Sequence, residues 1–184
     1  MRPVRRQPAS RQDRSKAVEP EDADAAFEAA VRRLARQPQS RLMLTRKLER
    51  DGYAAQAIES ALDRAQERGY LNDAEFARGL VRRRQAGRGG ALIAQELRAK
   101  GLGPAEVSAA LGLVDKQAEA GRALELARRV VLSRRPGSRQ ELREVVGSAL
   151  TRRGFTTGLI LHVIRELNAE ASVPDRFDTP GEPD

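Results

Sequence analysis

Residues 44–62 read LTRKLERDGYAAQAIESAL, and the spacing of their apolar residues around a single glycine predicts a pair of helices. Leu44 and Leu48 are four residues apart, so they lie on one face of a helix. Gly52 follows four residues later, where a helix ends in the left-handed conformation that glycine adopts without a Cβ clash. A second apolar pair, again four residues apart, then restarts the apolar face. The stretch therefore predicts a helix–turn–helix pair.

The same pattern returns twice further along the chain. Residues 93–111 read IAQELRAKGLGPAEVSAAL and residues 146–164 read VGSALTRRGFTTGLILHVI, at offsets of 49 and then 53 residues. Six positions keep their chemical class in all three stretches: Leu44, Leu48, Gly52, Tyr53, Ile58 and Leu62; Ile93, Leu97, Gly101, Leu102, Val107 and Leu111; Val146, Leu150, Gly154, Phe155, Ile160 and Ile164. Such self-similarity is the sequence signature of a repeat architecture.

A further helix is expected before each pair, because another apolar pair four residues apart precedes each copy. These pairs are Phe27 with Val31, Phe76 with Leu80, and Leu126 with Val130. The expected helices lie near residues 23–36, 40–51, 54–67, 72–86, 89–100, 103–113, 118–133, 138–153 and 156–170. Ser40, Asn72 and Ser138 stand at N-cap positions, and Glu75 follows Asn72 at the spacing of a capping box.

The sequence thus predicts an all-α fold of three tandem three-helix, helix–turn–helix-like repeats, at residues 22–71, 72–113 and 114–170. One unit is too small to bury its own core, so three stacked units are expected to form an elongated, curved body. Residues 1–21 are basic and proline-rich, and residues 171–184 are acidic and proline-rich. Both ends are expected to be disordered.

The composition excludes several kinds of site. The chain has no cysteine and a single histidine, His162, so neither a thiolate zinc site nor a catalytic triad can be assembled. No apolar run approaches the roughly 20 residues that span a bilayer, and the N-terminus lacks the apolar segment of a secretory signal. We expect a cytoplasmic, monomeric binding protein that is not an enzyme, uses no cofactor and has no membrane partner.

The charge distribution points to a polyanionic partner. Of the net charge of +8, residues 1–20 carry +4 and residues 171–184 carry −3, so the stretch between them carries +7. A basic folded body favours nucleic acid or an acidic protein surface as its partner. A generally arginine-rich composition would give part of the same excess.

One stretch carries a resemblance to a known family. Residues 67–77, ERGYLNDAEFA, resemble the RecX signature of Gly-Tyr-Leu-Asp/Asn-Asp followed by Phe-Ala. Arg84, a glycine-rich joint and IAQELRAKG at 93–101 follow as in that family, and the stretch from Gln39 to Tyr53 is similar to its first repeat. The resemblance covers about residues 25–167. In one departure, Gly89-Gly90 stands where the family often has Gly-Pro, so a looser joint is expected, since proline would fix φ there.

This resemblance implies a function that composition does not reveal. RecX proteins bind the RecA recombinase filament, lodge along its groove and suppress its ATPase, strand-exchange and co-protease activities, and so regulate recombination, DNA repair and the SOS response. They act without a cofactor. Two alternatives stay open: a helix–turn–helix repeat protein that binds single- or double-stranded DNA directly, and a structural helical-repeat adaptor.

The candidate contact residues form a central basic cluster, which we define as Arg78, Arg82, Arg83, Arg84, Arg88, Arg98 and Lys100. Arginine favours carboxylates and phosphates because its planar fork donates two parallel hydrogen bonds. The cluster either faces the filament or is a solvated helix face. Arg83 occupies the repeat position of the apolar Leu34, which marks either function or a helix end that has left the core.

Further basic side chains and the aromatic residues are weaker candidates. Secondary basic patches comprise Arg46, Lys47, Arg128, Arg129, Arg134 and Arg135, which either extend the basic surface or are helix-end cations. Phe27, Tyr53, Phe76 and Phe155 are expected in the core rather than as base-stacking platforms, and Tyr70 is expected to pack.

Overall fold

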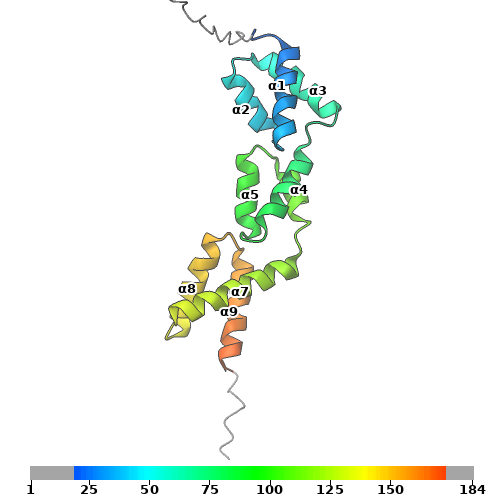
Figure 1. The fold of residues 1–184 in the computed structure, drawn as a ribbon. Coiled ribbons are helices and arrows are strands. Elements are labelled where there is room, and N and C mark those ends of the chain that lie inside the picture. The colour runs from blue at the N-terminus through cyan, green and yellow to red at the C-terminus, as the bar shows by residue number, and fades with distance from the viewer. Residues whose placement is uncertain (1–18, 173–184) are drawn as a thin grey trace, which may run out of the picture. The chain divides into compact units, whose positions relative to one another are not determined.

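A computed structural model describes residues 19–172, and every regular element in that range is an α-helix (Figure 1). The helices are α1 (Ala23–Arg36), α2 (Arg41–Arg50), α3 (Ala55–Glu67), α4 (Asp73–Arg84), α5 (Gly90–Ala99), α6 (Pro104–Leu111), α7 (Lys116–Arg134), α8 (Arg139–Arg152) and α9 (Thr157–Ser172). The predicted all-α class and the order of the helices are confirmed. The predicted disordered ends lie almost wholly outside the described residues.

The middle helix of each repeat ends as the sequence predicts. Gly52, Gly101 and Gly154 are left-handed, with φ of 98°, 88° and 78°. In each case the N–H of the next residue donates to the carbonyl five residues back: Tyr53 to Leu48 at 3.2 Å, Leu102 to Leu97 at 3.3 Å and Phe155 to Leu150 at 3.2 Å. This 6→1 bond belongs to the Schellman motif, which satisfies a carbonyl that the helix end leaves free.

The predicted N-caps are also confirmed. The Asn72 side chain accepts from the N–H of Glu75 at 2.9 Å, and Ser138 accepts from the N–H of Glu141 at 3.1 Å. The expected capping box differs, because the Glu75 carboxylate binds two arginines of its own helix. Helix α7 starts two residues earlier than expected, since Asp115 caps it by accepting from the N–H groups of residues 117 and 118.

Three hydrophobic clusters form the cores of the repeats. The first contains Leu44, Leu48, Ile58 and Leu62 together with Ala29, Ala30, Ala65 and Leu71. The second is built around Phe76, Leu80, Ile93 and Leu97, and the third around Val146, Leu150, Phe155, Ile160 and Ile164. The repeated apolar positions therefore form the core, as expected. The aromatic expectation is also confirmed, because Phe76 and Phe155 are buried and Phe27 and Tyr53 pack against the first cluster.

The chain divides into two compact units, which we describe separately. One contains the described residues up to Gln37 together with Leu44–Leu71, and the other contains Pro38–Met43 and the described chain from Asn72 onward. The second unit therefore holds the first turn of α2 as well as the second and third repeats. The exact repeat limits at 22–71, 72–113 and 114–170 stay predictions.

Within this second unit, helix ends meet through two similar sets of contacts. At the first, the Ser40 hydroxyl donates to the carbonyl of Lys100 at 2.6 Å, and the N–H of Arg41 donates to Asp73 Oδ1 at 2.8 Å. A Cβ on Gly101 would lie 2.4 Å from the Cβ of Leu42. The start of one helix thus caps the end of another, which satisfies polar groups at both ends.

The second set joins α5 to α8 and explains the pair Gly89-Gly90. The N–H of Gly89 donates to the carbonyl of Arg153 at 2.8 Å, and the N–H of Gly90 donates to Glu119 Oε1 at 2.8 Å. A Cβ on Gly89 would lie 2.4 Å from the carbonyl oxygen of Gly154. The structure therefore differs from the expected loose joint: Gly89 permits a close approach, and Gly90 supplies an N–H that proline lacks.

At the first of these contacts, the charge of the Asp73 carboxylate and its role as a hydrogen-bond acceptor have opposite effects on stability. Its half-burial raises the pKa of the Asp73 carboxyl, although the bond from the Arg41 N–H opposes the shift. A raised pKa means that the ionised form weakens the fold, so stability grows as the pH falls through the folded pKa. Asp73→Asn keeps the acceptor without the charge.

We therefore expect Asp73→Asn to leave the free energy of unfolding at pH 7 equal to or above that of the parent. Asp73→Ala removes the acceptor and should lower that free energy by about 1–2 kcal/mol. Urea denaturation followed by circular dichroism measures both variants. Equal losses in the two variants would contradict this interpretation, because the carboxylate charge itself would then be what stabilises the contact.

Candidate binding surface

All seven side chains of the central basic cluster reach the surface of the second unit. They lie on α4, on the segment after it, on α5 and, for Lys100, at the C-cap of α5, and each is partly or fully exposed. The structure does not leave them as one uniform group, however. Two glutamates divide the cluster into paired and unpaired members.

Glu75 binds the first two arginines. Its carboxylate accepts from Arg78 Nε at 2.9 Å and from Arg82 at 2.9 Å, because side chains three and seven residues along a helix lie on the same face. The hydrogen bonds from Arg82 and then Arg78 lower the pKa of Glu75. The spacing of these three residues was a signal in the sequence that the prediction did not use.

Glu96 binds the next two and is more enclosed, with a side chain 17% exposed. Its carboxylate accepts both Nε and a terminal nitrogen of Arg84 at 3.0 Å, and a terminal nitrogen of Arg88 at 2.8 Å. Burial by itself would raise the pKa of Glu96. The hydrogen bond from Arg84 and the charges of Arg84, Arg88 and Lys100 outweigh that effect, so the pKa is lowered.

The side chains of Arg83 and Arg98 form no ion pair within residues 19–172. Both residues are exposed, and Arg83 stands near the end of α4. Its repeat counterpart Leu34 instead packs against the first hydrophobic cluster. An exposed guanidinium without an internal carboxylate is available to an external anion at little desolvation cost, so these two residues are the clearest contact candidates in the cluster.

The secondary patches are placed unevenly. On α2, Arg46 is exposed and Lys47 is half-buried. On α7, Arg128 is paired with Glu170, and Arg129 lies 3.8 Å from Glu125. Arg135 ends α7 in the left-handed conformation with φ of 48°, which the sequence analysis did not predict.

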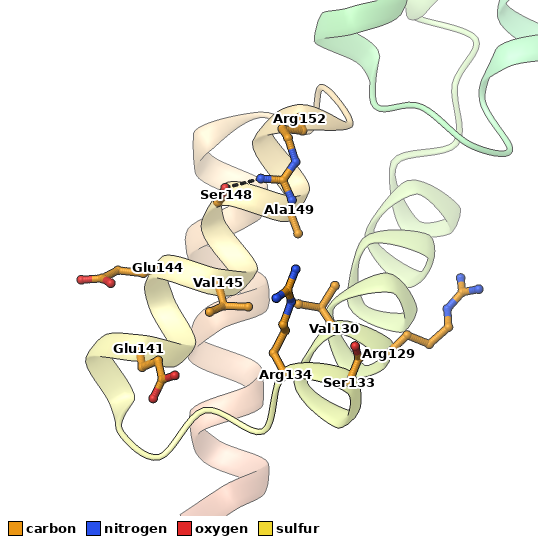
Figure 2. Close-up of a pocket in the computed structure, with 10 residues that line it drawn as sticks. All are labelled: Arg129, Val130, Ser133, Arg134, Glu141, Glu144, Val145, Ser148, Ala149 and Arg152. Carbon is orange, nitrogen blue, oxygen red and sulfur yellow. Dashed lines mark hydrogen bonds between the residues drawn. The ribbon is translucent and has the colours of Figure 1, made fainter.

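Arg134 lines an open groove between α7 and α8, which has a volume of about 680 Å³ (Figure 2). Arginines, glutamates, serines and small apolar residues share the lining: Arg129, Val130, Ser133, Arg134, Glu141, Glu144, Val145, Ser148, Ala149 and Arg152. Sequence reasoning did not find this groove, because it depends on how two helices of one repeat are spaced.

Two remaining sequence candidates have ordinary surroundings. His162 is exposed and lies 3.6 Å from Glu166 on the same helix. The Tyr70 ring lies 6.3 Å from that of Phe27, but Tyr70 is 53% exposed, so the expectation that it packs into the protein is only partly met. No group of three or more metal-ligating side chains occurs in the part of the chain that the structure describes.

Comparison with known proteins places these features in a family. The description "RecX, first three-helix domain" matches residues 26–64, and "RecX, second three-helix domain" matches residues 72–111. The regulatory protein RecX of Thermobifida fusca (strain YX) is 39% identical over 168 residues, which cover 89% of this chain and 90% of that protein. The chain belongs to the RecX family. A second relative, the regulatory protein RecX of Mycobacterium sp. (strain JLS), is 34% identical over 79% of this chain and 83% of its own length.

Solved RecX structures share the fold. The crystal structure of RecX from Lactobacillus salivarius superposes with a TM-score of 0.75 at 21% identity, covering 80% of this chain and 97% of that one. A second crystal structure of a regulatory protein RecX gives a TM-score of 0.71 at 22% identity, covering 79% and 73%. At this identity the likeness supports the fold of tandem three-helix repeats.

The RecX relatives are named as regulatory proteins, not as enzymes. Among the helices of residues 19–172, none combines the length and the apolar character that a membrane crossing requires.

Proposed function

We propose that this RecX-family chain binds the RecA filament and inhibits its ATPase, strand-exchange and co-protease activities. The observation that carries the proposal is family membership over most of the chain, with relatives that are named regulatory proteins. The protein acts as a cytoplasmic monomer in this proposal, and its contact is electrostatic. A basic surface fits both acidic side chains of the filament and the phosphates of the DNA inside it.

The structure selects which residues to change. Arg78, Arg82, Arg84 and Arg88 bind Glu75 or Glu96, so substituting them disturbs internal ion pairs as well as any contact. Substituting Arg83 and Arg98 removes charge without breaking those pairs. The variant Arg83→Ala/Arg98→Ala therefore tests contact separately from folding.

The assay follows ATP hydrolysis by the cognate RecA on single-stranded DNA with substoichiometric additions of this chain. The parent is expected to inhibit, and Arg83→Ala/Arg98→Ala should need at least about tenfold more protein, since each charged hydrogen bond contributes about 1.5–3 kcal/mol. Arg36→Ala/Arg143→Ala removes the same charge from exposed positions elsewhere and should inhibit like the parent.

Failure of the parent to inhibit would overturn the proposal. If the parent instead binds naked DNA with an affinity that falls steeply with salt, direct DNA binding replaces filament regulation, because counterion release dominates such binding. An equal loss in the Arg36→Ala/Arg143→Ala control would assign the effect to net charge alone. An adaptor role would show no dependence on RecA or on DNA.

A further inference from the structure

The second repeat closes the space between its first two helices with an internal ion pair. Arg84 at the end of α4 donates two hydrogen bonds to Glu96 on α5, each of 3.0 Å. The guanidinium and the carboxylate are nearly ideal partners, because two parallel donors meet two acceptor oxygens. We compare this ion pair with the two equivalent positions of the third repeat.

The third repeat keeps the arginine and lacks the carboxylate. Leu126 follows Phe76 by 50 residues, and at the same offset Arg134 takes the position of Arg84. Val146 follows Ile93 by 53 residues, and at that offset Ala149 takes the position of Glu96. Because the methyl group of Ala149 stands where the second repeat has the Glu96 carboxylate, Arg134 in the groove between α7 and α8 has no carboxylate at the facing position.

The geometry of the groove agrees with this comparison. In Figure 2 the Arg134 side chain extends into the groove between Val130 and Val145, toward Ala149. Arg152 enters from the opposite end, where it donates a hydrogen bond to the Ser148 hydroxyl. The Arg134 side chain makes no ion pair or hydrogen bond within the described chain.

The two glutamates of the lining do not supply the missing acceptor. In Figure 2 the Glu144 side chain points away from Arg134. Glu141 accepts from the N–H of Gly137 at 2.9 Å, and Glu144 accepts from the side-chain amide of Gln140 at 3.2 Å. Arg134 is exposed and pairs with no carboxylate of the described residues, so its guanidinium is accessible to a carboxylate that a partner supplies.

We propose that the groove binds an acidic protein segment, whose Asp or Glu carboxylate contacts Arg134 and whose adjacent apolar side chain covers Val130, Val145 and Ala149. Val130, Val145 and Ala149 are the apolar part of a mixed lining, and they favour a polypeptide over a bare phosphate backbone, which has no apolar side chain to bury against them. A volume of about 680 Å³ accommodates several residues of such a segment. The site is separate from the central basic cluster, and its occupant in this proposal is a segment of a partner protein.

The test measures binding of a fluorescein-labelled peptide, Ser-Asp-Leu-Glu-Leu-Asp-Ser, to the full-length chain by fluorescence anisotropy. Arg134→Ala should weaken binding about tenfold, the effect of losing one charged hydrogen bond. Ala149→Glu rebuilds the internal pair of the second repeat, so it should weaken binding at least as much while the melting temperature stays equal or rises. Ala149→Gln introduces a side chain of the same size as Ala149→Glu but without its charge, so it should weaken binding less.

Several results would overturn the proposal. Equal binding by the parent and Arg134→Ala would do so, as would equal binding of a peptide with Asn and Gln in place of the acids. If a labelled thymidine oligonucleotide depends on Arg134 and the peptide does not, the groove is a phosphate site. If the peptide binds only after Asp175, Asp178 and Glu182 are changed to amides in the full chain, the occupant is the protein's own C-terminal segment.

The peptide assay contains no RecA. A failure here therefore leaves the proposed filament regulation untouched, and failed inhibition of RecA leaves the peptide result interpretable. Circular dichroism of each variant separates loss of binding from loss of folding.

Discussion

Alanine at Gly154 is expected to lower the free energy of unfolding by about 3–5 kcal/mol, whereas alanine at Gly52 lowers it by about 1–2 kcal/mol. Both glycines end a middle helix and both have positive φ, of 78° and 98°. They differ in their surroundings: nothing lies within 4 Å of a Cβ on Gly52, but a Cβ on Gly154 would lie 2.2 Å from the Cβ of Leu92. The difference between the two losses of unfolding free energy therefore measures the clash with Leu92 separately from the backbone strain.

The clash should separate the end of α8 from the start of α5. Hydrogen exchange should then speed up at the N–H groups of Gly89 and Ala91, which donate to the carbonyls of Arg153 and Gly154 at 2.8 and 3.0 Å. Urea denaturation supplies the free energies, with Gly52→Ala as the matched control. Equal destabilisation by the two substitutions, with unchanged exchange at Gly89, would show that the helix ends do not depend on this approach.

Glu96→Gln is expected to lower the free energy of unfolding at pH 7 by about 1–3 kcal/mol, because Arg84 and Arg88 lose their shared carboxylate in a partly enclosed site. The pKa of Glu96 is lowered in the folded state from its ordinary value of 4.5. A lowered pKa contributes stability that is fully present above 4.5 and is lost as the pH falls through the folded pKa.

The parent should therefore lose more stability than Glu96→Gln between about pH 5 and pH 3. Thermal unfolding measured across that range tests the prediction. Glu75→Gln is a useful comparison. The pKa of Glu75 is also lowered, but the Glu75 carboxylate is far more exposed than that of Glu96, so this substitution should change the stability less. Parallel pH profiles for the parent and Glu96→Gln would refute a stabilising role for this ion pair.

The proposed groove shows why a charge pattern alone does not identify a contact surface. Arg84 and Arg134 occupy the same position in successive repeats, and both stand near the end of the first helix. One of them binds Glu96, and the other faces Ala149. For these two arginines, availability to a partner depends on the facing residue of the next helix, not on the arginine's own place in the repeat.

The sequence by itself determined the secondary structure and the core to within a few residues. Apolar spacing and helix-ending glycines act locally, so Leu48, Gly52 and Ile58 encode their turn without reference to distant residues. The three cores followed from the same repeated positions. The resemblance in residues 67–77 added the family, which the relatives confirm.

Only the tertiary structure decided which charges pair between helices and which glycines are needed for close approach. Gly52 and Gly154 match in sequence pattern and in φ, yet only Gly154 lies against another helix. Likewise, seven neighbouring cations became two glutamate-centred groups and a few unpaired side chains. The Arg84–Glu96 pair and the approach of Gly154 to Leu92 join residues of different helices, and a pattern that repeats along the sequence does not contain that information.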